Sequence, residues 1–204
     1  KDACMTCHRR TLLASAALGA LSAALPAAAQ DTWPTKTVRL IVPYAAGGFA
    51  DTRARKIADA LGKTLGQPVI VDNRAGAGGV TGTDAIAKAT DGHTFGFGSP
   101  APLVTNPMLM KKMPYDAEKA FKPIILIETA PLFLSTAPNQ NFKSVKELLD
   151  FARANPGKLT YGSSGVGGAH HLSAELLAYQ TKTETTHVPY KGGALAANDL
   201  MGGH

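Results

Sequence analysis

The chain has 204 residues, a formal net charge of +6 and 45% hydrophobic residues. This length is enough for one domain of ordinary size or for two small lobes. The basic side chains are scattered along the chain and are not interleaved with aromatic residues, so we expect no nucleic-acid partner. The mild excess of positive charge favours anionic small molecules instead.

The first residues have the pattern of a secretory signal. Arg9 and Arg10 precede an uncharged, Ala- and Leu-rich stretch over residues 11–25, and a proline and three small residues ending at Ala29 follow it. This pattern predicts export with cleavage near Ala29, and the apolar stretch is too short to span a membrane. The paired arginines permit a twin-arginine route, and a general secretory signal fits as well. We therefore expect an exported protein in which residues 1–29 are signal peptide and upstream sequence.

The two cysteines lie ahead of the apolar part of this signal. Cys4, Cys7 and His8 form the C-x-x-C-H pattern of covalent haem attachment. Because these residues would be removed on export, we interpret the match as accidental and expect no cofactor. The exported part has no cysteine, so we expect neither disulfides nor thiolate chemistry in it.

Strand and helix patterns alternate along the first half of the exported part. Residues 37–44, "TVRLIVPY", predict a buried strand, and from Asp51 apolar residues recur at helical spacing until Gly66 and Pro68. A short strand, "PVIVD", a helix near 83–89 and a third strand in "DGHTFGFGS" follow. This alternation predicts a parallel, doubly wound sheet, in which ligands bind at the carboxyl ends of the strands.

The second half repeats the alternation. Residues 121–128, "FKPIILIE", and 131–136, "PLFLST", predict strands, and "SVKELLDFARANPG" predicts a helix with a capping box between Ser144 and Glu147. The segments "KLTYGSSGVGGAHHLSAELLAY" and "THVPYKGGALAANDLMGG" each predict a strand, a glycine-containing loop and a helix.

Three junctions between a strand and a helix share one form. They are "PYAAGGFAD", "YGSSGVGGAHH" and "PYKGGALAAND". The first N–H groups of a helix lack partners and carry the positive end of its dipole, and glycine lets a ligand oxygen approach them closely. A single loop of this kind is explained as well by a tight turn. Three of them in one exported chain favour a cleft that binds carboxylate or phosphate.

The chain resembles the solute-binding receptors of tripartite tricarboxylate transporters, the TctC or Bug family of periplasmic proteins. The likeness runs from about Trp33 to the last residue and rests on segments in the family's order and spacing: "WPTKTVRLIVPYAAGGFAD", "NRAGAGGVTGTDAIAKATDGHTF", "NPMLMKKMPYDAEKAFKPI", "YGSSGVGGAHHLSAELL" and "VPYKGGALAANDLMGG". It implies a two-lobed, periplasmic-binding-protein-like (Venus-flytrap) α/β fold with doubly wound sheets. The first lobe would comprise residues 30–130 and the second, incomplete lobe residues 131–204. It also implies a monomer that delivers a solute to membrane transporter subunits and catalyses nothing.

The same resemblance implies which residues bind the ligand. In this family the first glycine loop and the later serine-glycine loop close on a ligand carboxylate through backbone amides, hydroxyls and bridging waters. The residues carried over are Tyr44, Gly47, Gly48, Asp51, Ser99, Asn106, Ser163, Ser164, Gly165, His171, Tyr190 and Lys191. The implied ligand is a small organic acid or an amino acid, and the sequence does not select among these. No metal is implied.

Several of these residues have a second interpretation. Asp51 either caps its helix, which is usual for an acidic residue in a first turn, or binds a ligand amine. His170 and His171 are adjacent, so they point about 100° apart on a helix and are not the i, i+4 pair of a metal site. Lys191 either meets an acid or is solvated. Phe49, where the family commonly has a small or polar residue, either narrows the cleft towards an apolar ligand tail or packs elsewhere.

Enzyme functions are the alternatives to a receptor. Residues 76–82, "GAGGVTG", distantly resemble a dinucleotide fingerprint, but their spacing is wrong and no strand-end acidic residue appears about 20 positions on. A hydrolase needs G-x-S-x-G, and "GSSGV" around Ser164 lacks the final glycine. An exported hydrolase-like or nucleotide-binding enzyme, or a solute sensor for a signalling partner, stays as the alternative.

The resemblance also implies a C-terminal truncation, because members of the family are longer than this chain. The face of the first lobe that later residues cover would then be partly open. We expect the 204-residue chain on its own to be marginally stable and to bind ligand weakly or not at all.

Overall fold

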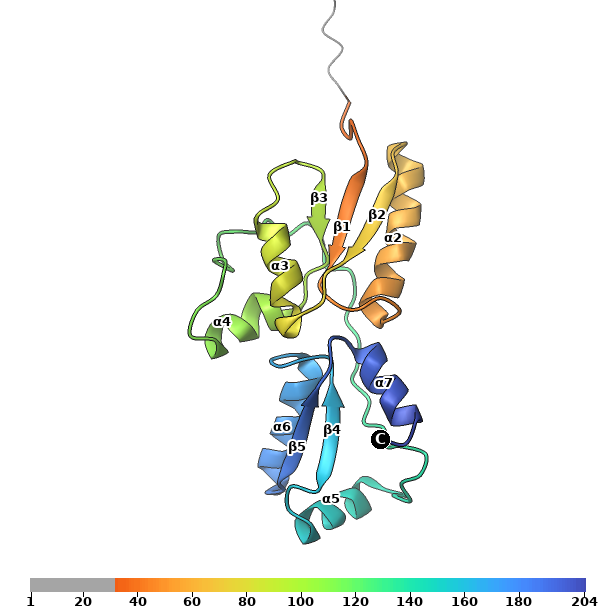
Figure 1. Cartoon of the computed structure of the whole chain (residues 1–204), viewed down its shortest axis with the longest axis vertical. Coiled ribbons are helices and arrows are strands. Elements are labelled where there is room, and N and C mark those ends of the chain that lie inside the picture. The colour runs from red at the N-terminus through yellow and green to blue at the C-terminus, as the bar shows by residue number, and fades with distance from the viewer. Residues whose placement is uncertain (1–31) are drawn as a thin grey trace, which may run out of the picture. The chain divides into compact units, whose positions relative to one another are not determined.

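The computed structural model describes residues 32–204, so the predicted signal peptide lies outside the described residues. Lys36–His204 form one compact unit. In the preceding unit, Lys1–Thr35, the described residues contain a cis peptide bond between Trp33 and Pro34. The compact unit contains two parallel sheets, one of three strands and one of two (Figure 1). The predicted mixed α/β architecture is therefore confirmed.

The three-stranded sheet has the order β2-β1-β3. Its strands are β1 (Val38–Val42), β2 (Val69–Asn73) and β3 (Thr94–Gly96). Both neighbours of β1 run parallel to it, with Val38 opposite Val69 and Arg39 opposite Thr94. All three carboxyl ends therefore meet at one edge, where the first predicted site residues follow the strands.

Helices cover both faces of this sheet. Helix α2 (Phe49–Leu65) packs through Ala54 on the face that carries Leu40, Val42 and Phe97, which together form the core. Helix α3 (Val80–Ala87) lies on the other face, where a Cβ on Gly96 would overlap the side chain of Ile86. Alternate strand residues point to opposite faces, so this sheet is doubly wound as predicted (Figure 1).

The two helices begin earlier than predicted. Helix α2 starts at Phe49, with Gly48 as its N-cap, and ends at Leu65, followed by the C-cap Gly66, whose φ of 66° is left-handed. Helix α3 starts at Val80, because Gly79 with a φ of 95° ends the 3-10 turn Ala77–Gly79 that precedes it. The end of α2 was predicted correctly from glycine and proline, whereas the glycine-rich segment hid the start of α3.

The second sheet pairs β4 (Leu159–Ser163) with β5 (Thr185–Pro189). Helix α6 (Ala169–Thr181) follows β4 and helix α7 (Gly193–Met201) follows β5, as predicted. Helix α5 (Val145–Ala154) precedes them, and its N-cap Ser144 accepts the backbone N–H of Glu147 at 3.2 Å. The Glu147 side chain accepts the N–H of Lys143 at 2.9 Å, so the predicted capping box is present with its return bond one residue earlier.

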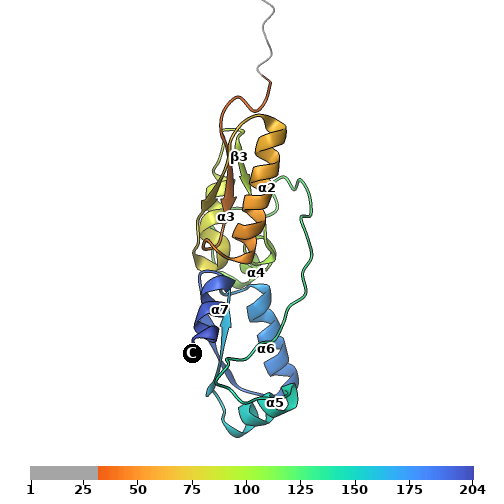
Figure 2. The ribbon, with the colours of Figure 1, turned by 90° about the vertical axis from the view of Figure 1, so that its right-hand side faces the viewer.

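The strands predicted at 121–128 and 131–136 are absent, and this prediction was wrong. After a short π-helix (Ala101–Thr105) and the short helix α4 (Asn106–Leu109), the chain reaches α5 as a long connection without a described helix or strand (Figure 2). The apolar side chains of residues 124–134 are exposed, Ile125 by 80% and Phe133 by 84%. An apolar run forms a strand only where another strand offers its backbone, and neither described sheet pairs with these residues.

Candidate functional site

The first glycine loop, residues 43–48, links β1 to α2. The Asp51 carboxylate, in the first turn of α2, accepts the N–H of Gly47 at 2.8 Å and so fixes the loop from inside the helix. Gly47 has a φ of 81°, a left-handed conformation that disfavours any side chain. Asp51 therefore positions the loop, which agrees with the capping interpretation.

Asp51 is buried and ion-paired. Only 3% of its surface is exposed, and Arg55, one turn later, lies 3.0 Å from each carboxylate oxygen. Burial raises the pKa of Asp51, but the hydrogen bonds from Arg55 and Gly47 outweigh burial, so its pKa lies below the ordinary value. The carboxylate is thus charged at neutral pH, and its charge is neutralised by Arg55 rather than offered to a ligand amine.

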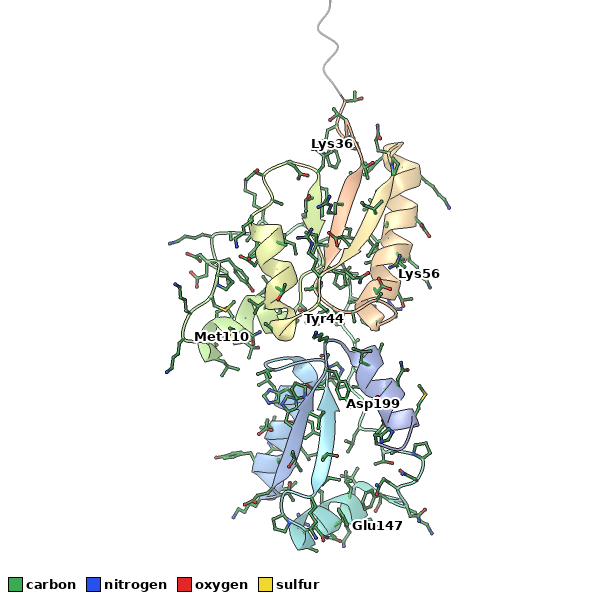
Figure 3. All side chains as sticks on the ribbon, in the orientation of Figure 1. Lys36, Tyr44, Lys56, Met110, Glu147 and Asp199 are labelled. Carbon is green, nitrogen blue, oxygen red and sulfur yellow. The ribbon has the colours of Figure 1, made fainter. Side chains whose placement is uncertain are left out.

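Two hydroxyl groups meet at the carboxyl edge of the first sheet. The Tyr44 hydroxyl, after β1, lies 2.6 Å from Ser99 Oγ, after β3, and Figure 3 shows Tyr44 at that edge. Asn73, at the end of β2, donates from its side chain to the Tyr44 carbonyl at 3.1 Å. Burial raises the pKa of the Tyr44 phenol, partly offset by the Ser99 hydrogen bond, so the phenol stays neutral at pH 7. The predicted residues Tyr44 and Ser99 therefore form a pair.

Asn106 lies where two glycine-rich segments come close. Its side chain is buried at 3% exposure, and its amide atoms would collide with a Cβ on Gly167 and crowd one on Gly78. A Cβ on Gly78 would also lie 2.4 Å from the Val166 carbonyl oxygen. Only glycine permits this approach of the segment after β2 to the segment after β4.

The serine-glycine loop, residues 163–168, links β4 to α6. The Ser163 hydroxyl is buried, accepts the N–H of Gly165 at 3.1 Å and lies 2.7 Å from His187 Nε2. The Ser164 hydroxyl lies 2.9 Å from His170 Nδ1. Ser163 thus braces the loop internally, while Ser164 lies on its more open side.

The pair of Ser164 and His170 bears on the hydrolase alternative. Sequence reasoning found no histidine partner for this serine, and the structure provides one. Among the hydrogen bonds of the described residues, however, no carboxylate is bonded to His170, so the third group of a triad is missing.

The last junction, residues 190–193, contacts the first glycine loop. The Ala45 N–H donates to the Lys191 carbonyl at 3.0 Å, and a Cβ on Gly48 would lie 3.8 Å from the Cβ of Ala194. The Tyr190 hydroxyl donates to Asp199 on α7 at 2.6 Å (Figure 3 labels Asp199). This junction thus brings the Lys191 backbone to the first loop, whereas the Tyr190 hydroxyl is bonded to α7.

The helix starts at these three junctions are capped by glycine. Gly48, Gly168 and Gly192 are the N-caps of α2, α6 and α7, and none has a side-chain cap hydrogen bond. Helix α5, which follows no such junction, uses Ser144 as an ordinary cap. The first N–H groups of the three helices are therefore not satisfied by a cap side chain, which suits an anion ligand.

Sequence reasoning missed three residues that shape this region. Asn73 holds the Tyr44 carbonyl, Gly78 permits the approach of Val166, and His187 holds Ser163. Asn73 and Gly78 both belong to the segment "NRAGAGG", so their place at the end of β2 and just after it was a usable signal. His187 is an isolated histidine within a strand and gave none.

Phe49 makes a local contact. The Arg53 guanidinium lies 4.4 Å from the centre of the Phe49 ring, and Arg53 Nε donates to Glu128 at 3.1 Å. Phe49 remains 53% exposed. Its ring is therefore tied to the polar surface of α2 by a cation–π contact.

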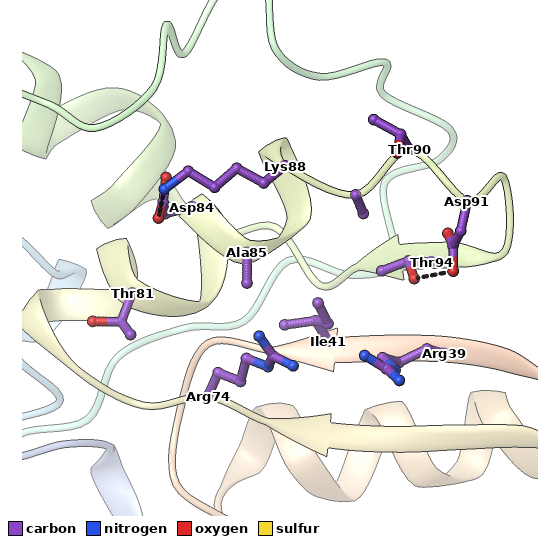
Figure 4. Close-up of a pocket in the computed structure, with 11 residues that line it drawn as sticks. Arg39, Ile41, Arg74, Thr81, Asp84, Ala85, Lys88, Thr90, Asp91 and Thr94 are labelled. Atoms are coloured by element: carbon purple, nitrogen blue, oxygen red, sulfur yellow. Dashed lines mark hydrogen bonds and ion pairs between the residues drawn. The ribbon is translucent and has the colours of Figure 1, made fainter.

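A cavity of about 540 Å³ lies on the α3 side of the first sheet (Figure 4). It contains none of the predicted site residues. Its Lys88 is paired with Asp84 at 2.6 Å, and Arg74, also in its lining, is paired with Asp72 at 3.0 Å. Because two of its cations are already paired and it lies away from the glycine-capped helix starts, we do not assign it to the ligand.

Within residues 32–204, no group of three or more side chains is arranged to hold a metal ion. None of the helices in this described part combines the length and apolar character needed to cross a membrane.

Solved structures define the class of protein. The Rpa4515 protein of R. palustris, solved with adipate, is 41% identical with a TM-score of 0.80, over 84% of this chain and 57% of that one. MatC from Rhodopseudomonas palustris, with bound malate, is 32% identical with a TM-score of 0.78, over 84% and 58%. The fold is that of periplasmic binding proteins, as the resemblance implied.

Sequence comparisons identify the family. The model of the tripartite tricarboxylate transporter family receptor (TctC) matches residues 53–204, and the chain belongs to this family. Protein BugT of Bordetella pertussis is 41% identical over 175 residues, which is 85% of this chain and 54% of BugT. The chain spans a little over half the length of these relatives. Its place is among non-enzymatic binding proteins, as expected.

Proposed function

We propose that the protein captures a small carboxylate-bearing solute in the periplasm and delivers it to membrane transporter subunits of the tripartite tricarboxylate type. The observation that carries this proposal is the set of three glycine-capped helix starts, on α2, α6 and α7. Two of them approach each other where Gly48 faces Ala194. Their N–H groups and dipoles favour an anion without a charged side chain in contact with it.

The neutral side chains around these helix starts fit the same ligand. Tyr44 and Ser99 offer hydroxyl groups, and Asn106 offers an amide. Arg55, which lies one turn after the first loop, is held by Asp51 and is thereby neutralised. Discrimination among acids then depends on the geometry of hydrogen-bond donors rather than on net charge.

The ligands of the two solved relatives, adipate and malate, support a dicarboxylate as the first candidate. Adipate and malate each carry two carboxylates, and two helix starts that approach each other offer two anion sites. The proposal also includes export with cleavage near Ala29, a monomeric receptor, and two lobes of which residues 30–130 and 131–204 form parts. Gly165, His171, Tyr190 and Lys191 stay proposed ligand residues.

A thermal-shift screen of the whole protein, as its gene encodes it, tests the proposal. The panel contains adipate, malate, a tricarboxylate, acidic amino acids and aromatic acids, with neutral sugars as controls. One acid at 100 times its Kd should stabilise the fold by about 2.7 kcal/mol. A folded protein that no acid stabilises, or that sugars stabilise instead, would contradict carboxylate capture.

A further inference from the structure

Three aromatic rings stack beside the serine-glycine loop. The rings of His187 on β5 and His171 on α6 have their centres 4.1 Å apart and their planes inclined by 28°. The ring centre of Tyr161 on β4 lies 4.9 Å from that of His187. The Tyr161 hydroxyl donates to Glu175 on α6 at 2.5 Å. The titratable neighbours of His187 within the described residues are therefore His171, Tyr161 and Glu175.

Both histidines hold the serine-glycine loop. His171 Nδ1 accepts the N–H of Gly167 at 3.2 Å, so this nitrogen carries no proton. His187 Nε2 lies 2.7 Å from the Ser163 hydroxyl, which in turn accepts the N–H of Gly165. The imidazoles thus engage the backbone of the loop at two places, one directly and one through Ser163.

A proton on His171 changes this arrangement. Protonated Nδ1 is a donor and cannot accept the Gly167 N–H, so that N–H is released from the imidazole. A second proton on His187 would place two cations 4.1 Å apart, which is unfavourable, so the pair holds one added proton rather than two. Protonation thus frees one backbone donor and puts one positive charge beside the loop.

We infer that the His171–His187 pair takes up a proton when a carboxylate binds at the serine-glycine loop, which couples ligand capture to pH. This inference rests on the proposed function. The released Gly167 N–H and the new imidazolium charge both stabilise an anion, and by linkage the anion stabilises the proton. The third histidine of this region, His170, bonds to Ser164 and lies outside the stack.

The lowered pKa of His187 agrees with this coupling. Burial lowers the pKa of His187, and so does neighbouring His171 whenever its own ring is protonated, while the charge of Glu175 opposes them. His187 is therefore neutral near pH 7 without an anion, and the proton has to be acquired on binding.

Calorimetric titration of the whole protein with adipate tests the coupling. The titrations are made at pH 8 and pH 6, each in two buffers of different ionisation enthalpy, which gives the number of protons taken up. We expect binding to be at least about fivefold tighter at pH 6 than at pH 8, with proton uptake. Equal affinity at the two pH values without proton uptake overturns the inference and leaves carboxylate capture standing. If neither adipate nor another acid of the panel binds at either pH, the proposed function and this inference both fail.

Two variants locate the proton. His171→Asn and His187→Gln keep a polar atom near Nδ1 and Nε2 but do not titrate, and His170→Asn is the matched control. The quantity compared is the ratio of Kd at pH 8 to Kd at pH 6 within each variant, so a change in absolute affinity does not matter. The ratio should approach one in the double variant H171N/H187Q and stay as in the wild type in H170N. If the ratio of Kd at pH 8 to Kd at pH 6 falls to one in H170N, or stays at the wild-type value in the double variant, the proton does not belong to the His171–His187 pair.

A measurement on the wild-type protein without ligand tests the inference even if a variant fails to fold. In the wild-type protein, the NMR signal of the Gly167 amide should shift between pH 8 and pH 6 with the midpoint of the His171 ring signals. A Gly167 signal that does not follow His171 contradicts the proposed release of its N–H.

Discussion

Asp51 Oδ2 accepts the backbone N–H of Gly47 at 2.8 Å. The first glycine loop is therefore held by a buried carboxylate in the first turn of α2, the helix that follows the loop. Arg55 neutralises this carboxylate and also donates to Asn73 at 3.3 Å, and Asn73 donates to the Tyr44 carbonyl. One chain of polar contacts thus fixes the loop that we propose faces the ligand.

Asp51→Asn should lower both stability and affinity. The variant loses the charge that holds Arg55 and weakens the Gly47 contact, at a cost of about 1–3 kcal/mol in unfolding free energy at pH 7. The low pKa of Asp51 contributes stability that is present above the unfolded-state pKa of about 4 and lost as pH falls below it. Urea unfolding should therefore show a smaller difference in unfolding free energy between D51N and wild type at pH 3 than at pH 7. Asp59→Asn, on the exposed side of α2, is the control and should change little.

Tyr44→Phe should reduce affinity more than stability. The substitution removes the hydroxyl that lies 2.6 Å from Ser99 and costs about 1 kcal/mol of unfolding free energy, while ligand binding should weaken about tenfold. Calorimetry and thermal unfolding measure the two effects. Tyr179→Phe removes a hydroxyl from a ring that is 83% exposed, and affinity should be unchanged. Equal affinity of Y44F and wild type would remove Tyr44 from the site.

Much of the fold could be predicted from the sequence because periodicity and glycine are local signals. The helix end at Gly66 and the three strand-to-helix junctions were predicted from such signals. The run at 121–128 has the apolar content of a strand, but a strand also needs a neighbour, which composition does not reveal. The family resemblance proposed Tyr44 and Ser99, whereas the contact of His187 with Ser163 spans 24 residues and depends on the pairing of β4 with β5.

Gly78→Ala should disrupt the approach of the serine-glycine loop. The new Cβ would lie 2.4 Å from the Val166 carbonyl oxygen, and its φ of 63° is left-handed. Gly66→Ala is a matched control, because its φ is 66° and a Cβ there meets nothing within 4 Å. We expect G66A to lose about 1 kcal/mol of unfolding free energy through backbone strain alone, and G78A to lose clearly more together with ligand binding. Equal losses in the two variants would show that the close approach is unimportant.

His187→Gln should flatten the dependence of stability on pH. The unfolded chain binds a proton on this histidine near the ordinary pKa of about 6.5, whereas burial lowers the folded-state pKa. Stability contributed by the neutral ring is therefore fully present above pH 6.5 and falls as pH drops towards the folded-state pKa. Urea unfolding between pH 7.5 and pH 5 should show a smaller slope for H187Q than for wild type. An unchanged slope would contradict the burial of His187 as a neutral group.

The central claim is that backbone N–H groups at glycine-capped helix starts hold a carboxylate. The most direct measurement compares, by calorimetry on the whole protein, the acid that stabilises it best with the neutral amide of the same acid. We expect one-to-one binding of the acid and a loss of at least about 100-fold in affinity for the amide, because the amide carries no charge for the helix dipoles. Amide binding as tight as acid binding would rule out a carboxylate held by the helix starts, and so would a folded protein that binds neither.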